Sequence, residues 1–237
     1  MTQHPDQSGR SDSMQGPKMQ IHEVLGCPPH EGDVGSGLVF RTSRGEIPAI
    51  LHSAPDSKQG VIWVCGARGG FGGPAKGVYS RLSESFAAQG ITSLRLSYRQ
   101  PNVFPECMLD LLAGVTFFQS TGYEPVIMVG HSFGGAVVIA AGAASHHVRG
   151  VVSLSPQTYG ANMAGLLSPK PLLVVHGKSD TRLPYSCGVQ IHDWAKEPKE
   201  LVIFDGAEHR LDECGDELES LLGKWIPEKL RSISQEK

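Results

Sequence analysis

A serine flanked by glycines is the residue pattern in this sequence best placed to do chemistry. Residues 126–135 read Val-Ile-Met-Val-Gly-His-Ser-Phe-Gly-Gly, an apolar run that ends in Gly-x-Ser-x-Gly around Ser132. Where a strand turns sharply into a helix at such a serine, side chains two positions away on either side would collide with neighbouring backbone. The pattern predicts a nucleophilic serine at a helix start, with an ordinary serine in a glycine-rich turn as the alternative.

A nucleophilic serine needs a general base, and the base needs a carboxylate that fixes its tautomer and stabilises its charged form. Among the ten histidines, His209 lies just after the apolar run 201–204, and Asp180 lies just after the run 172–175. Functional groups of a parallel sheet gather beyond the carboxyl ends of its strands. The chain order Ser132, Asp180, His209 therefore predicts a catalytic triad.

Three other side chains compete for these roles. Asp205 is the rival acid, although it lies only four residues before His209 on the same loop. We expect the side chain of His131 to point away from the serine. We expect His176, at the end of a strand, to pack or hydrogen-bond locally.

Acyl transfer also needs N–H donors for the developing oxyanion. The backbone N–H of Phe133 is expected to be one donor, because Phe133 follows the serine. The glycine-rich loop 66–73 is expected to provide the second, at Ala67 or, as second choice, at Arg68. The Arg68 side chain could also attract an anionic group of the substrate, with a solvated arginine as the alternative. A phosphate-cradling loop is the competing interpretation, but its glycine spacing fits poorly.

Short apolar runs alternating with amphipathic segments indicate the elements that position these residues. Such alternation is typical of a parallel sheet covered by helices on both faces. A leading hairpin is predicted from residues 38–40 and 47–51, with Gly45 in its turn. The remaining strands are predicted at 61–65, 91–96, 126–129, 151–154, 172–175 and 201–204, and helices at 78–89, 106–119, 133–144, 188–195 and 213–225. The fold class is thus a doubly wound α/β domain.

Over residues 37–225 the chain resembles the α/β-hydrolase superfamily, in its compact dienelactone-hydrolase-like and esterase-like branches. Residues 130–134, 177–180 (Gly-Lys-Ser-Asp) and 207–209 (Ala-Glu-His) carry the resemblance. It implies an eight-stranded, mostly parallel sheet with a leading antiparallel strand, and serine hydrolase chemistry without a cofactor. Two departures matter. Dienelactone hydrolases use a cysteine where Ser132 stands, so their substrate is not carried over, and the common His-Gly of the oxyanion strand is Cys65-Gly66 here.

The same resemblance places any cap after the strand 151–154, where residues 155–170 are too few for a lid domain. We therefore expect an open site lined by Tyr159, Met163, Leu166 and Leu167, with simple loop packing as the alternative. Residues 1–20 are predicted to be a disordered polar tail, or sequence upstream of a later start at Met14 or Met19. Residues 21–237 are predicted to form a single domain.

Composition excludes several classes of protein. Lys and Arg number 21 against 24 Asp and Glu, a net charge of −3, so a nucleic-acid partner is disfavoured. The sequence contains no run of about 18 apolar residues, which is the length that a helix needs to span a membrane. Five scattered cysteines without Cys-x-x-Cys spacing favour reduced thiols in the cytoplasm. Histidine pairs with metal-ligand spacing are absent, so no metal or cofactor is expected. The oligomeric state is left open.

Together these features predict a cytoplasmic serine hydrolase that cleaves carboxylic esters of small to medium acyl substrates through an acyl-enzyme. A thioesterase or a serine peptidase with the same triad is the enzymatic alternative. A non-catalytic binding protein of the same fold is the alternative from a different class.

Overall fold

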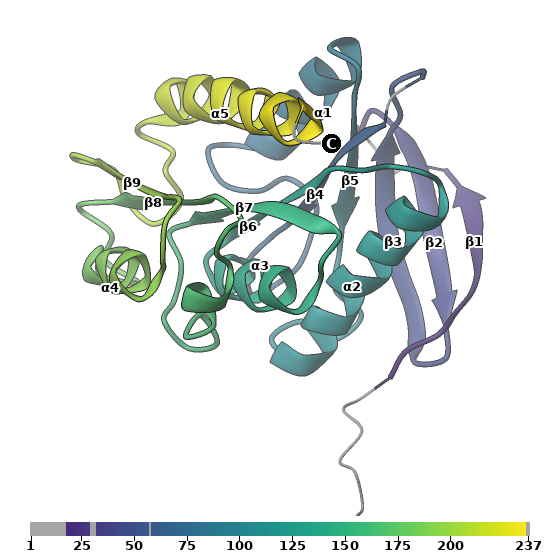
Figure 1. Cartoon of the computed structure of the whole chain (residues 1–237), viewed down its shortest axis with the longest axis horizontal. Helices are drawn as coiled ribbons and strands as arrows, with labels where there is room; N and C mark the ends of the chain where they lie inside the picture. Colours follow the sequence, from purple (N-terminus) through teal and green to yellow (C-terminus); the bar gives the residue numbers. More distant parts are fainter. Residues whose placement is uncertain (1–17, 29–31, 57, 236–237) are drawn as a thin grey trace, which may run out of the picture.

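The computed structural model describes residues 18–28, 32–56 and 58–235, which form one twisted sheet with helices on both faces (Figure 1). Most of the predicted tail, residues 1–17, lies outside the described residues. The strands are β1 (Ile21–Cys27), β2 (Ser36–Thr42), β3 (Gly45–His52), β4 (Gln59–Val64), β5 (Ile91–Leu96), β6 (Val126–His131), β7 (Val148–Leu154), β8 (Leu172–Gly177) and β9 (Lys199–Phe204). The helices are α1 (Val78–Ala88), α2 (Phe104–Ser120), α3 (Phe133–Ala144), the single 3₁₀ turn η1 (Ala164–Leu166), α4 (Ser186–Trp194) and α5 (Gly215–Gln235).

The strand order is β1-β2-β3-β5-β4-β6-β7-β8-β9. The first three strands are antiparallel to their neighbours, and β3 also pairs antiparallel with β5. From β5 to β9 every pairing is parallel. The predicted doubly wound, mostly parallel sheet with a leading antiparallel hairpin is therefore confirmed. The crossover between β4 and β6 places the carboxyl ends of these central strands side by side.

The predicted number of eight strands is wrong, because β1 adds a ninth at the antiparallel edge. Its residues are intermediate or exposed, without the continuous burial of the inner strands. An edge strand of this kind has one neighbour and little core contact, so its sequence lacks a strong apolar signal. Backbone pairing with residues 37–42 of β2 holds it in place.

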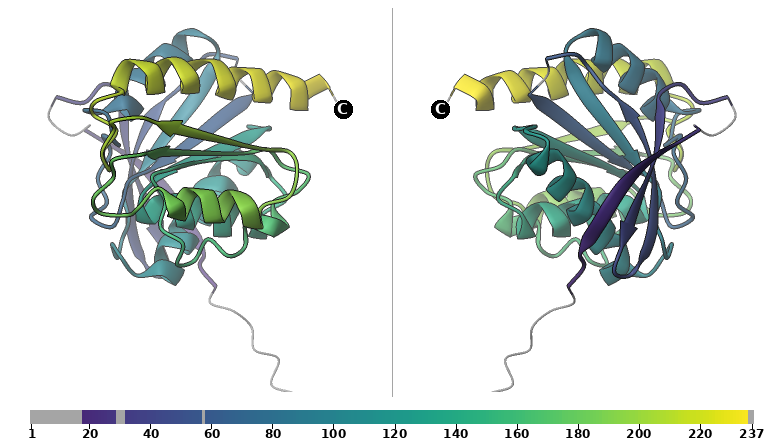
Figure 2. Two further views of the ribbon diagram at one scale, coloured as in Figure 1. Left: turned by 90° about the vertical axis from the view of Figure 1, so that its left-hand side faces the viewer. Right: turned by 90° about the vertical axis from the view of Figure 1, so that its right-hand side faces the viewer.

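Alternate residues of the inner strands supply two separate cores. Ile62 and Val64 of β4 pack with the side chains of α2 and α3, whereas Val61 and Trp63 pack with those of α1 and α5. Because successive strand side chains point to opposite faces, a strand covered on both faces is apolar throughout. Figure 2 shows α5 above the sheet and α4 below it. No helix in the described part of the chain is both long and apolar enough to cross a membrane.

Candidate active site

Ser132 occupies the junction between β6 and α3 in a backbone conformation that non-glycine residues rarely adopt. Its φ is 58° and its ψ is −119°. Such a conformation costs on the order of 1–3 kcal/mol, and it persists only where the surroundings enforce it. Here the Ser132 N–H donates to the carbonyl of Leu154 in β7 at 2.8 Å, and the Gly135 N–H donates to the Ser132 carbonyl at 3.0 Å. The sharp turn predicted from the sequence is therefore present.

The two flanking glycines are required by close backbone approach. A Cβ on Gly130 would lie 2.5 Å from the carbonyl carbon of Gly134 and 3.0 Å from the nitrogen of Gly135. A Cβ on Gly134 would overlap the carbonyl oxygen of Cys65 and come within 3.0 Å of the Tyr98 hydroxyl. Any side chain at either position would push α3 away from the sheet and displace the serine.

The three predicted triad residues meet at the carboxyl edge of the sheet. His209 Nε2 lies 2.9 Å from Ser132 Oγ, and His209 Nδ1 lies 2.8 Å from Asp180 Oδ2. Since a carboxylate only accepts, Nδ1 carries the proton and Nε2 is free to accept the serine hydroxyl proton. The rival acid Asp205 is exposed and pairs instead with Lys178 at 2.7 Å.

Backbone bonds between two loops bring Asp180 and His209 together. The N–H of Ser179 donates to the carbonyl of Ala207 at 3.0 Å, and the N–H of Lys178 donates to the carbonyl of Phe204 at 2.9 Å. Gly177 permits this approach, because a Cβ there would lie 2.7 Å from the Ala207 carbonyl carbon. The loops after β8 and β9 are thus joined by backbone hydrogen bonds, and together they carry Asp180 and His209.

Asp180 is buried, yet it is held as a carboxylate. Its Oδ1 accepts the N–H groups of Arg182 and Leu183, each at 2.9 Å. Burial raises the pKa of Asp180, but the Leu183 N–H and the His209 ring outweigh it and lower the pKa below its ordinary value. Asp180 is therefore ionised at neutral pH and able to stabilise a charged imidazole.

His131 does not point away from this site as the sequence suggested. Its Nε2 lies 2.9 Å from the carbonyl oxygen of His209, and the two rings are 4.9 Å apart. Burial lowers the pKa of His131 to about 4, so the ring is neutral and donates through Nε2. His131 thus anchors the backbone of His209, a contact that its position beside the serine did not signal.

The glycine-rich loop lies directly over Ser132. A Cβ on Gly66 would lie 3.4 Å from the Cβ of Ser132. The loop makes a turn at this point, which is closed by a 2.9 Å hydrogen bond from the Gly69 N–H to the Gly66 carbonyl. Among the described residues, no protein acceptor receives the backbone N–H of Ala67 or of Phe133. Neither predicted oxyanion donor is therefore engaged within the described part of the chain; Ala67 lines the cavity over the serine, and Phe133 is not among its lining residues. Phe133 also begins α3, whose N-terminal dipole favours negative charge.

A cavity of about 350 Å³ opens over the serine. Its lining contains three arginines and no aspartate or glutamate among the described residues. Arg210 forms an ion pair with Asp212 at 3.2 Å, while Arg68 and Arg182 make no ion pair with a described residue. The lining residues are Cys65, Gly66, Ala67, Arg68, Gly69, Gly70, Phe71, Gly72, Gly73, Pro74, His131, Ser132, Arg182, His209 and Arg210.

Solved structures with the same arrangement identify the fold. Est1E from Butyrivibrio proteoclasticus aligns with a TM-score of 0.71 and 18% identity, over 82% of this chain and 99% of that one. A dienelactone hydrolase from Anabaena variabilis aligns with a TM-score of 0.69 and 15% identity, over 91% and 100%. XC6422 from Xanthomonas campestris, described as a serine hydrolase without lid, aligns with a TM-score of 0.61 and 18% identity, over 85% of this chain and 99% of that one. The chain has the α/β-hydrolase fold.

Sequence comparison adds a shorter match. No family model matches the chain. An uncharacterized protein, YfhR of Escherichia coli, is 36% identical over 67 residues, which is 28% of this chain and 24% of that protein. The chain thus matches about a quarter of the length of that curated relative.

In this α/β-hydrolase fold the segment between β7 and β8 is a loop with the single turn η1, so no lid domain is present among the described residues. Of the residues predicted to bind substrate, Arg68 lines the cavity over the serine, but Tyr159 and Met163 do not. Tyr159 is 74% exposed, and its ring contacts Phe104, which in turn contacts Phe133. The loop packs beside the site through this row of rings.

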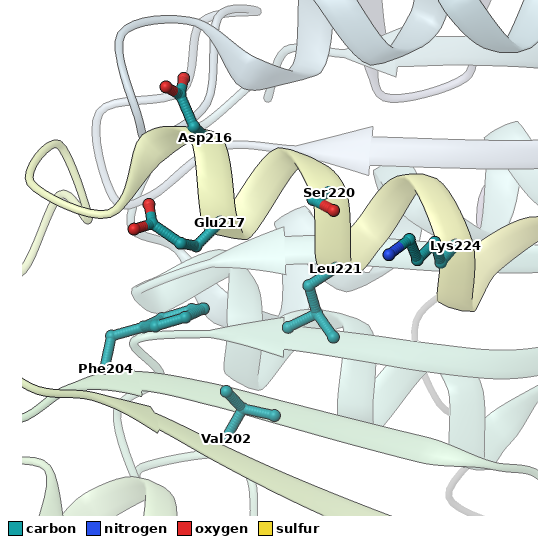
Figure 3. A pocket seen from close by; sticks show the side chains of 7 residues that line it. All are labelled: Val202, Phe204, Asp216, Glu217, Ser220, Leu221 and Lys224. Atoms are coloured by element: carbon teal, nitrogen blue, oxygen red, sulfur yellow. The ribbon is translucent and has the colours of Figure 1, made fainter.

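A larger cavity, of about 620 Å³, lies between β9 and α5 (Figure 3). It is lined by Val202, Phe204, Asp216, Glu217, Ser220, Leu221 and Lys224. This lining contains a serine but no histidine, so it offers no pair of nucleophile and base. Within the described residues, no group of three or more His, Cys, Asp or Glu side chains is arranged to hold a metal ion. The site with hydrolytic geometry is the smaller cavity at Ser132.

Proposed function

We propose that this chain is a serine hydrolase that cleaves carboxylic esters of small to medium acyl groups through an acyl-enzyme. The observation that carries the proposal is the continuous hydrogen-bonded row from Ser132 Oγ through both nitrogens of His209 to Asp180, with spacings of 2.9 Å and 2.8 Å. These distances lie within the range that proton transfer requires.

The mechanism follows from the positions of these atoms. His209 Nε2 takes the hydroxyl proton as Ser132 Oγ bonds to the ester carbonyl carbon, and the charge that forms on the carbonyl oxygen is received by the N–H groups of Phe133 and Ala67. The protonated His209 then gives its proton to the departing alcohol oxygen as the C–O bond breaks. Water next loses a proton to Nε2, attacks the acyl carbon and releases the acid, and the proton returns to Ser132 Oγ.

The cavity favours substrates that carry an anionic group near the ester. Arg68, Arg182 and Arg210 line it, and its lining among the described residues includes no carboxylate. Guanidinium groups bind carboxylates with two parallel hydrogen bonds and steer anions toward a site. A volume of about 350 Å³ suits a small-molecule substrate.

The proposed compartment is the cytoplasm. All five cysteines are unpaired, and Cys65, Cys107 and Cys214 are buried. Unpaired thiols support a reducing environment.

The test is hydrolysis of an ester, a thioester and an anilide that share one butyryl group, by the wild type and by Ser132→Ala. We expect ester hydrolysis, with kcat reduced by about 10⁴-fold or more in the alanine variant. Faster cleavage of the thioester or of the anilide would assign the same site to a thioesterase or a peptidase. Ester hydrolysis that survives in Ser132→Ala, or no hydrolysis of any compound by the wild type, would contradict the proposal and favour a binding protein.

A further inference from the structure

A second histidine contacts the acid of the proposed triad. His176 lies near the end of β8, and its side chain is completely buried. Its Nε2 is 3.1 Å from Asp180 Oδ2 and 2.9 Å from the carbonyl oxygen of Leu183. Both neighbours accept hydrogen bonds, so Nε2 must carry a proton and share it between them.

The other nitrogen of this ring fixes its charge. His176 Nδ1 is buried and has no hydrogen-bond partner among the described residues. It faces Gly188 of α4, where a Cβ would lie only 2.8 Å away. A proton on Nδ1 would be a buried donor without an acceptor, which is costly, and burial accordingly lowers the pKa of His176. The ring is therefore neutral, with its hydrogen on Nε2.

Asp180 Oδ2 consequently lies between two imidazole N–H groups. His209 Nδ1 is 2.8 Å from it and His176 Nε2 is 3.1 Å from it. The other oxygen, Oδ1, is held by N–H groups of residues 182 and 183 in the same turn. The hydrogen bond from His176 differs from these two local bonds, because its donor belongs to β8. It therefore connects the carboxylate to the sheet.

We propose that His176 is a positioning residue, which holds Asp180 Oδ2 toward His209 and takes up part of the carboxylate charge. The effect of His176 on catalysis rests on the proposed function, ester hydrolysis at Ser132. A second donor on Oδ2 reduces the negative charge that His209 experiences, and so it weakens the stabilisation of the charged imidazole. Loss of the donor should leave more of the Asp180 charge on the hydrogen bond from His209 Nδ1 and loosen the orientation of Asp180.

Other ionisable groups lie around this pair, and a substitution at position 176 replaces none of them. His131 contacts the His209 carbonyl, and Arg210 lines the same cavity; burial raises the pKa of Cys187 on α4, with a smaller effect from the charge of Asp180. Arg182 donates its backbone N–H to Asp180, and Glu208 binds Thr181 at 3.0 Å. A shift of the His209 Nδ1–H proton resonance in a position-176 variant therefore reports the missing donor.

The experiment combines histidine ring NMR with kinetics on His176→Leu and His176→Gln. Leucine removes the donor, whereas the glutamine amide can replace it. His192→Leu is the matched control, because His192 lies on α4 and its side chain is only 25% exposed. In the wild type we expect His176 to be neutral at pH 7, with its hydrogen on Nε2. In His176→Leu we expect the Nδ1–H proton resonance of His209 to shift and kcat/KM per titrated active site to fall about 10-fold.

The glutamine and His192 variants should stay within about threefold of the wild type in kcat/KM, with an unchanged acid limb of the pH profile. A His176 ring that carries its hydrogen on Nδ1, or that is doubly protonated at neutral pH, overturns the proposal. This NMR measurement is made on the wild type and does not depend on whether the variants fold. An unshifted His209 in a folded leucine variant overturns it as well. An NMR shift of His209 in a protein without ester turnover supports the positioning role and contradicts only the proposed hydrolysis.

Discussion

Replacing Gly130 by alanine tests whether the tight turn at the serine controls activity. The added Cβ would lie 2.5 Å from the Gly134 carbonyl carbon. Because two carbons pack at roughly 3.5 Å, β6 and the start of α3 must separate by about 1 Å. Gly130 is not among the glycines with positive φ, so alanine causes no backbone strain there. The cost of the substitution is therefore the steric overlap of the added Cβ.

A displacement of about 1 Å would lengthen the 2.9 Å contact between Ser132 Oγ and His209 Nε2 beyond hydrogen-bonding distance. We expect Gly130→Ala to lower kcat/KM by about 100-fold and to lower the free energy of unfolding by about 1–3 kcal/mol. The assays are hydrolysis of a chromogenic butyryl ester and unfolding in urea.

Gly26→Ala is the matched control, because a Cβ on Gly26 in β1 would have no neighbour within 4 Å. Its stability should change by less than about 0.5 kcal/mol, with activity unaffected. If Gly130→Ala kept the stability and the kcat/KM of the wild type within twofold, the steric explanation of the turn would be refuted.

Three further predictions concern charge. Asp180→Asn should lower kcat by about 10⁴-fold, because an amide can leave His209 in the wrong tautomer; steady-state kinetics measure it, and a loss below tenfold would count against Asp180 as the acid. Arg68→Gln should raise KM about fivefold for p-nitrophenyl hemisuccinate but not for the neutral butyrate; equal effects on both esters would remove the case for an anion contact. Hydrogen bonds from Arg44, and then from Arg99, lower the pKa of Glu106 to about 2 against the opposing effect of burial. The ionised Glu106 therefore stabilises the fold fully above its unfolded pKa of about 4.3, and this contribution is lost as pH falls toward 2. Glu106→Gln should accordingly lower the urea midpoint at pH 7, with a gap to the wild type that narrows below about pH 4; a gap that is the same at pH 7 and pH 3 would refute this.

The elements buried on both sides were predictable from sequence, because continuous apolar runs carry a strong signal. The run 91–96 matches β5, and the predicted helix 133–144 matches α3. The closing helix was predicted to end at residue 225, but α5 continues through Pro227 to residue 235. Proline usually ends a helix, yet buried Ile226, Leu230 and Ile233 keep this one packed on the sheet.

The meeting of Ser132, Asp180 and His209 was predictable because each follows a strand, and parallel strands end at one edge. The contacts around them were not. Spacing along the sequence cannot show that His131 anchors the His209 backbone, or that His176 contacts Asp180, because both contacts depend on how the segments after the strands fold against one another. The same is true of the exposed Tyr159, whose loop conformation decides whether it reaches the cavity.

Covalent labelling of the serine tests the central claim most directly. The wild type would be treated with a fluorophosphonate, which reacts with activated serine hydroxyls, and the modified peptide would be identified by mass spectrometry. The geometry of Ser132, 2.9 Å from His209 Nε2, predicts one adduct, on Ser132, that is absent in Ser132→Ala and strongly slowed in His209→Gln. A folded wild type that remains unlabelled, or that is labelled equally well in Ser132→Ala, would contradict the account.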